Sequence, residues 1–203
     1  PAGDQDCTAS CRLTWIGKGK RAPEVKCING INKAAGKLYG TLAKRQKSCL
    51  KARTLKGDQS PPEACLGADN KGKINKSESA VRSAELFQCV PKGKNRYNVP
   101  PFGYSGFQSV VDGVTTDTSA MLLDLFGEDL DATLTTKAVN KNKALCQNRV
   151  GVQTGMILKA KVDSYTKCIA KELLDDYMNS STHLAQCLTW DEGLAPGGAT
   201  DKY

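Results

Sequence analysis

The clearest pattern in the chain is a helical one over residues 27–49. Apolar side chains recur there at steps of three, four or seven residues, and lysines occupy positions between them. The apolar positions are Ile31, Ala35, Leu38, Leu42 and Cys49, and the lysines are Lys33, Lys37, Lys44 and Lys47. Pro23 and Glu24 suit the first turn, because proline needs no amide partner there and an acid complements the helix dipole. The pattern predicts a long amphipathic helix.

A second segment, residues 146–168, repeats the Cys-x21-Cys spacing of the first. Aligned on the cysteines, the two segments share Asn29 with Asn148 and Gly36 with Gly155. The equal cysteine spacing favours an internal duplication. The second segment has its own helical stripe of Cys146, Val150, Thr154, Ile157, Tyr165 and Cys168. We therefore expect two long helices that pack antiparallel.

Three glycines in the first segment, Gly30, Gly36 and Gly40, weaken a helix by up to about 1 kcal/mol each relative to alanine. One interpretation is a close approach between helix backbones. The other is a tolerated defect that the disulfides hold in place.

Shorter elements complete the expected fold. Residues 77–90 are predicted to form a helix, and so are residues 117–126, capped by Thr116 or Asp117 and ended by Gly127. Residues 52–76 and 91–108 are predicted loops, residues 191–203 an extended tail, and the best strand signal is residues 113–116. The expected fold class is mainly α: one domain over residues 1–203, a disulfide-stapled helical bundle built on two long antiparallel helices with long irregular loops.

Nine cysteines are spread along the 203 residues: Cys7, Cys11, Cys27, Cys49, Cys65, Cys89, Cys146, Cys168 and Cys187. Zinc sites need close cysteine pairs in matching sets, which this spacing lacks, so disulfides are expected. One possible pairing staples the two long helices at both ends, Cys27 to Cys168 and Cys49 to Cys146. The other joins the helix cysteines to loop cysteines, namely Cys11, Cys65, Cys89 or Cys187. The odd count leaves one thiol free or bonded between chains.

Disulfides persist in oxidising compartments, so the protein is expected to be secreted, periplasmic or at the cell surface. The chain opens with Pro-Ala-Gly-Asp-Gln-Asp, without a basic and then apolar leader, and we interpret this as a signal peptide already removed. No apolar run approaches the length of about 20 residues that a membrane-spanning helix needs, so no transmembrane segment is expected.

Charge is unevenly distributed along the chain. The formal net charge is +8, with 20 Lys and Arg against 8 Asp and Glu in residues 1–100, and 9 against 13 in the rest. This asymmetry can steer self-association, or attract another surface protein or an anionic polymer such as a glycan, DNA or lipid head groups. No specific nucleic-acid motif is present. Lysines along a helix are more often a solvated face than a binding site.

Signatures of catalysis are missing from the sequence. Neither a GxSxG nucleophile motif nor a phosphate-binding Walker loop occurs, and His183 is the single histidine. We expect no enzymatic activity, no cofactor and no metal. The candidate binding surface is a basic and aromatic loop with Lys92, Lys94, Arg96, Tyr97, Phe102 and Tyr104. The alternative is that its aromatic rings fill a gap in the core.

The Cys-x21-Cys helices resemble the helical repeats of uncharacterised secreted proteins and lipoproteins of deltaproteobacterial type. The stretches Leu125–Asp131 and Lys143–Gln147 are similar to that group as well. The resemblance implies a bacterial, exported, helical and disulfide-bonded protein, and no activity comes with it. The chain lacks a lipobox cysteine at its first residue, which departs from the lipoproteins of the group.

Together these observations favour an extracellular structural or interaction protein without enzymatic activity, such as a subunit of a cell-surface assembly or filament. The alternative is a secreted binding module for an anionic polymer or a small ligand.

Overall fold

The computed structural model describes residues 23–90, 104–172 and 187. The two expected long helices are present as α1 (Pro23–Lys51) and α6 (Lys141–Glu172), of 29 and 32 residues. Between them the chain forms these elements in order: η1 (Ala52–Lys56), α2 (Pro62–Gly67), α3 (Lys73–Ala84), η2 (Glu85–Cys89), α4 (Phe107–Phe126) and α5 (Leu130–Thr133). The described residues contain no strand, so the expected mainly α fold is confirmed.

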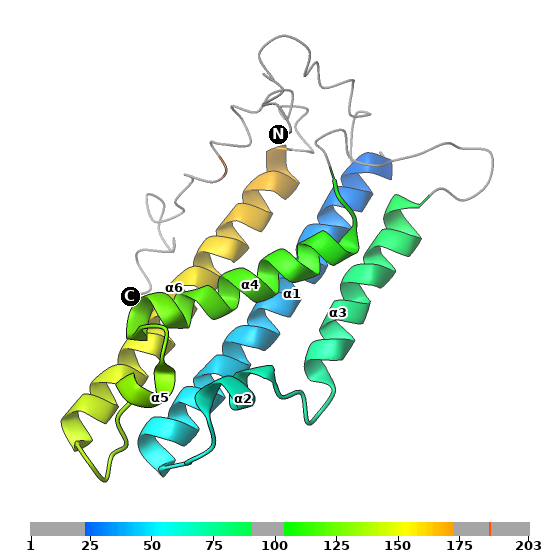
Figure 1. The fold of residues 1–203 in the computed structure, drawn as a ribbon. Coiled ribbons are helices and arrows are strands. Elements are labelled where there is room, and N and C mark those ends of the chain that lie inside the picture. Colours follow the sequence, from blue (N-terminus) through cyan, green and yellow to red (C-terminus); the bar gives the residue numbers. More distant parts are fainter. Residues whose placement is uncertain (1–22, 91–103, 173–186, 188–203) are drawn as a thin grey trace, which may run out of the picture.

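Helix α1 lies at the centre of the arrangement, between α3 and α6, and α4 crosses it on one side (Figure 1). A Cβ placed at Gly36 would contact Val162, one at Gly40 would contact Lys159, and one at Gly151 would meet Leu50. As the residue number rises along α1, the number of its partner in α6 falls, so the two helices are antiparallel, as expected. Helices α3, α1 and α6 thus form one layer, and α4 covers one face of it.

The main core lies where α1 meets α3 and α4. It consists of Cys27, Ile31, Ala34, Leu38, Leu42, Val81, Ala84, Cys89 and Val111. A smaller cluster of Leu50, Leu130 and Leu134, flanked by Leu66 and Phe126, closes the other end of α1. In the main core, the residues from α1 and from α3 are spaced three or four positions apart on their helices. Removal of these apolar faces from water therefore drives the packing.

The prediction for the start of α4 was wrong. The helix begins at Phe107, ten residues before the predicted start and within the predicted loop of residues 91–108. It continues through residues 113–116, which carried the best of the few strand signals. The expected cap residues Thr116 and Asp117 lie inside it. Its first amide, that of Phe107, instead donates to Glu85 Oε1 at 3.1 Å, and Glu85 belongs to η2. A carboxylate from another element therefore binds the first amide of α4, and the sequence around residue 107 does not contain this partner. The predicted end at Gly127 is confirmed, with a φ of 90° that suits glycine.

The segment predicted as a loop over residues 52–76 contains more structure than expected. It holds η1, the short helix α2 and the first turn of α3. Pro62 starts α2 and is buried, and Cys65 within α2 is bonded to α1. Glycine, proline and charged residues weaken the helical pattern here, and these short helical turns are held by tertiary contacts instead.

The disulfides follow the second of the two pairings considered. Cys27 is bonded to Cys89, Cys49 to Cys65, and Cys168 to Cys187. The two long helices are not stapled to each other. Cys27 and Cys49 belong to the buried side of α1 that carries Leu38 and Leu42, whereas α6 packs along the side that carries Gly36 and Gly40. Cys146 is free and exposed, and Cys7 and Cys11 lie outside the described residues.

The glycines of α1 do not mark a tight helix crossing. A Cβ at Gly36 or Gly40 would lie 3.8 or 4.0 Å from its nearest neighbour in α6, an ordinary contact, and one at Gly30 would meet only the flexible Gln88 side chain. The tight approach is at Gly151 of α6, where a Cβ would lie 2.4 Å from Leu50 Cδ2. The internal duplication stays a prediction.

Candidate functional site

The most distinctive surface feature is a row of lysines along α1, which we call the lysine stripe. It consists of Lys26, Lys33, Lys37, Lys44, Lys47 and Lys51, all exposed. Their separations of seven, four, seven, three and four residues place them within an arc of about 80° on a helix that turns about 100° per residue. At about 1.5 Å per residue, the stripe extends over roughly 37 Å. It is therefore a long, narrow band of positive charge.

The lysine stripe faces away from α4. Leu42 lies about 180° around α1 from the centre of the stripe and belongs to the core. On that same core side, the side chain of Gln46 donates to the carbonyl oxygen of Thr118 in α4. Among the described residues, no helix covers the face of the three-helix layer that carries the stripe.

Neighbouring helices add further lysines to this surface. Lys159 and Lys167 of α6 and Lys76 of α3 are exposed beside the stripe. We call the combined surface of the stripe and these three residues the lysine face.

One groove of the lysine face runs between α1 and α6, with a volume of about 610 Å³. Gly36 and Gly40 form part of its lining, and the absence of side chains at these positions keeps it open. Asp163 is the only carboxylate among the described residues that line this groove, and it pairs with Lys159 at 2.5 Å. The groove therefore has a surplus of positive charge.

The other groove lies between α1 and α3, with a volume of about 510 Å³. It shares Lys33 and Lys37 with the first groove and adds Lys76 of α3. Small residues form much of its lining: Gly30, Ala34, Ala80, Ser79, Ser83 and Ala84. No carboxylate is among its described lining residues. At one end lies Phe87 of η2, whose side chain is 67% exposed.

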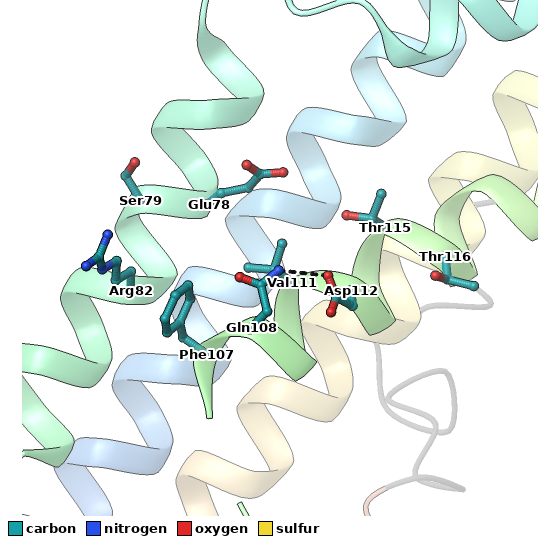
Figure 2. A pocket seen from close by; sticks show the side chains of 9 residues that line it. All are labelled: Glu78, Ser79, Arg82, Phe107, Gln108, Val111, Asp112, Thr115 and Thr116. Atoms are coloured by element: carbon teal, nitrogen blue, oxygen red, sulfur yellow. Dashed lines mark hydrogen bonds between the residues drawn. The ribbon is translucent and has the colours of Figure 1, made fainter. Parts of the chain in front are cut away.

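A third groove, between α3 and α4, is lined by both acidic and basic side chains (Figure 2). Glu78 and Arg82 line it from α3, and Asp112, which accepts from Gln108 Nε2 at 2.8 Å, lines it from α4. The Arg82 guanidinium lies 5.7 Å from the centre of the Phe107 ring, a cation–π contact. Charges of both signs share this groove, so it offers no net attraction to a polyanion.

Most of the predicted binding loop, with Lys92, Lys94, Arg96, Tyr97 and Phe102, lies outside the described residues. Tyr104 is described, and it packs against the main core with its hydroxyl donating to Glu85 Oε1 at 3.1 Å. Burial, and then this hydrogen bond, raises the pKa of Tyr104. At this position the aromatic ring fills the edge of the core. This matches the alternative for the loop, in which its aromatic rings fill a gap in the core instead of binding a ligand.

The lysine face was missed as a site by sequence reasoning, although its signal was present. The lysines of residues 27–49 were read as a solvated helix face. Recognising them as a site requires knowing that α3 and α6 flank the stripe and that the glycines leave grooves beside it.

The described residues offer neither a cluster of metal ligands nor a membrane-spanning helix. No three His, Cys, Asp or Glu side chains of the described ranges gather closely enough to hold a metal ion. None of the described helices is long and apolar enough to cross a membrane. The single histidine, His183, lies outside the described residues.

Three disulfides within the described residues fit a protein of an oxidising, non-cytoplasmic compartment. Comparison of the chain with protein families, with curated proteins and with solved structures finds no match to any of them. The resemblance to secreted helical-repeat proteins therefore stays a prediction. The lysine face is the feature from which a function can be inferred.

Proposed function

We propose that this protein is a secreted or periplasmic interaction protein, without enzymatic activity, that binds an anionic polymer through its lysine face. The observation that supports the proposal most is the composition of the two grooves. They contain six exposed lysines, and Asp163, which pairs with Lys159, is the only carboxylate among their described lining residues. The six are Lys33, Lys37, Lys44, Lys76, Lys159 and Lys167.

The length of the lysine stripe favours a polymer over a small ligand. A surface lysine interacts only weakly with a single anion in water, because the solvent and salt screen the charge. A linear polyanion contacts many lysines at once and releases its condensed counterions, so the contributions add. A stripe of roughly 37 Å matches a ligand of that shape.

The disulfides support the proposed location. Cys27–Cys89 closes a sequence separation of 62 residues, and Cys49–Cys65 closes one of 16. In the chain-entropy description, bridges of this kind stabilise a small fold by about 3–4 kcal/mol each. Such a fold relies on an oxidising environment, where surface glycans, DNA and lipid head groups are the available polyanions.

A variant with Lys33→Gln, Lys37→Gln and Lys44→Gln tests the proposal. We expect it to bind a sulfated linear polysaccharide or DNA at least tenfold more weakly than the wild type, measured by fluorescence anisotropy at low salt. The logarithm of the binding constant should also depend less steeply on the logarithm of salt concentration, because fewer counterions are released.

The matched control changes the same number of charges elsewhere. Lys137, Lys141 and Lys143 are exposed and line none of the three grooves. If their replacement by Gln weakens binding as much as the first triple variant does, the effect is one of net charge and the lysine face is not the site. Absence of any salt-dependent binding would refute the proposal.

A second candidate function, a subunit of an assembly, has one observation in its favour. Cys146, Val150 and Ile157 of α6 are exposed and separated by four and seven residues, so they lie along one side of the helix. Sedimentation analysis with and without reductant tests it. A reductant-sensitive dimer that the Cys146→Ser variant lacks would support an assembly subunit, and a monomer at all concentrations would refute it.

A further inference from the structure

We infer that the polymer bound by the lysine face is a single-stranded nucleic acid, which lies in the groove between α1 and α3 with one base stacked on Phe87. This inference rests on the proposed function and adds the class of the ligand. Three features of the groove support it: an exposed aromatic ring, lysines in a described lining that contains no carboxylate, and an ordered backbone around the ring.

Phe87 is the most exposed aromatic side chain of the described residues, at 67%, although it lines a groove next to the main core. Large apolar side chains at the surface are individually common, and their position decides whether they matter. This ring lies at one end of a lysine-lined groove. Grooves that combine positive charge with an aromatic ring are the usual means of holding unpaired bases, because every base has a flat face that can stack.

The backbone that carries Phe87 is fixed on both sides. Two residues before it, Glu85 accepts hydrogen bonds from Tyr104 and from the first amide of α4. Two residues after it, Cys89 is bonded to Cys27 in the core. The backbone on either side of the ring is therefore ordered before a ligand arrives, so little backbone freedom is lost on binding.

The lysines are placed to follow a sugar–phosphate backbone. Lys33 and Lys37 are one helical turn apart, about 6 Å along α1, and Lys76 lies on the opposite wall. An ammonium group on a flexible stem binds phosphate as a point charge without reading sequence. The small residues between the walls leave room for the chain, and no carboxylate of the described lining repels it.

These features favour a single strand over a duplex. Paired and stacked bases keep their faces inside the helix, where a surface ring such as Phe87 does not reach them. A single strand exposes base faces and phosphates together. This mode of binding tolerates any sequence, which agrees with the absence of a sequence-reading motif in the chain.

The experiment measures binding of three probes to the full chain at several salt concentrations: a fluorescent oligothymidylate, a DNA duplex of equal length and a sulfated polysaccharide. We expect the oligothymidylate to bind most tightly. Phe87→Ala should weaken its binding by about five- to tenfold and leave the polysaccharide unaffected, because only the stacking contact is lost. Leu86→Ala is the control, since this neighbour is also exposed and does not line the groove.

The outcomes separate this inference from the proposed function. The single-strand inference is overturned if the polysaccharide or the duplex binds more tightly than the single strand, or if Phe87→Ala and Leu86→Ala weaken binding equally. In either case, binding that still depends on the lysines supports the proposed function. If none of the three probes binds, both fail. Phe87→Trp adds a positive test, because a larger ring should bind the oligothymidylate at least as tightly as phenylalanine does.

Discussion

Glu85 links the main core to the start of α4, and its removal should destabilise the protein. The half-buried Glu85 Oε1 accepts two hydrogen bonds of 3.1 Å, one from the Phe107 amide and one from the Tyr104 hydroxyl. In Glu85→Ala both donors lose their partner. The Phe107 amide is a helix N-terminal donor without an intrahelical acceptor, so α4 loses its cap.

The cost follows from these two bonds. Loss of a helix cap typically costs about 1 kcal/mol, and loss of a partner for a partly buried hydroxyl costs about another 1 kcal/mol. We therefore expect Glu85→Ala to lower the free energy of unfolding by roughly 2 kcal/mol. Tyr104→Phe should lower it by about 1 kcal/mol. The double variant should lose no more than Glu85→Ala alone, which corresponds to a coupling of about 1 kcal/mol between the two side chains.

Urea denaturation with intact disulfides, followed by circular dichroism, measures these changes. Hydrogen exchange of the first turn of α4 should become faster in Glu85→Ala, because this turn loses its cap. Glu128→Ala is the control, since Glu128 is exposed and lies between α4 and α5. The reasoning is refuted if Glu85→Ala destabilises the protein no more than the control, or if the effects of Glu85→Ala and Tyr104→Phe simply add.

Two further predictions concern other parts of the helix layer. Gly151→Ala should destabilise the protein in thermal denaturation, because the new Cβ would lie 2.4 Å from Leu50 Cδ2. Gly155→Ala should instead stabilise α6 by up to about 1 kcal/mol, because a Cβ at that position would have no neighbour within 4 Å. Burial raises the pKa of Tyr39 to about 12. The folded state therefore holds this proton more tightly than the unfolded chain, whose tyrosines titrate near 10. The contribution of Tyr39 to stability is complete below pH of about 10 and is lost as the pH rises towards 12. Tyr39→Phe should reduce this loss in denaturation at alkaline pH, and equal alkaline slopes for the two proteins would contradict the assignment.

Local sequence patterns were enough to predict the long helices. Apolar residues at helical spacing, Pro23 at the start of α1 and Gly127 after α4 act within a few residues of the backbone that they shape. The cysteine content likewise predicted a disulfide framework, which is present in the described residues.

The tertiary structure decided what depends on distant residues. The carboxylate that binds the first amide of α4 comes from Glu85, 22 positions before Phe107, so the pattern around residue 107 does not contain it. The disulfide partners of Cys27 and Cys49 depend on which side of α1 faces the core. The lysines of α1 were visible in the sequence, and they became a candidate site only because α4 covers the opposite face while α3 and α6 form a groove on either side. Helical spacing fixes which side chains share a face, and only the packing of the other helices fixes what that face meets.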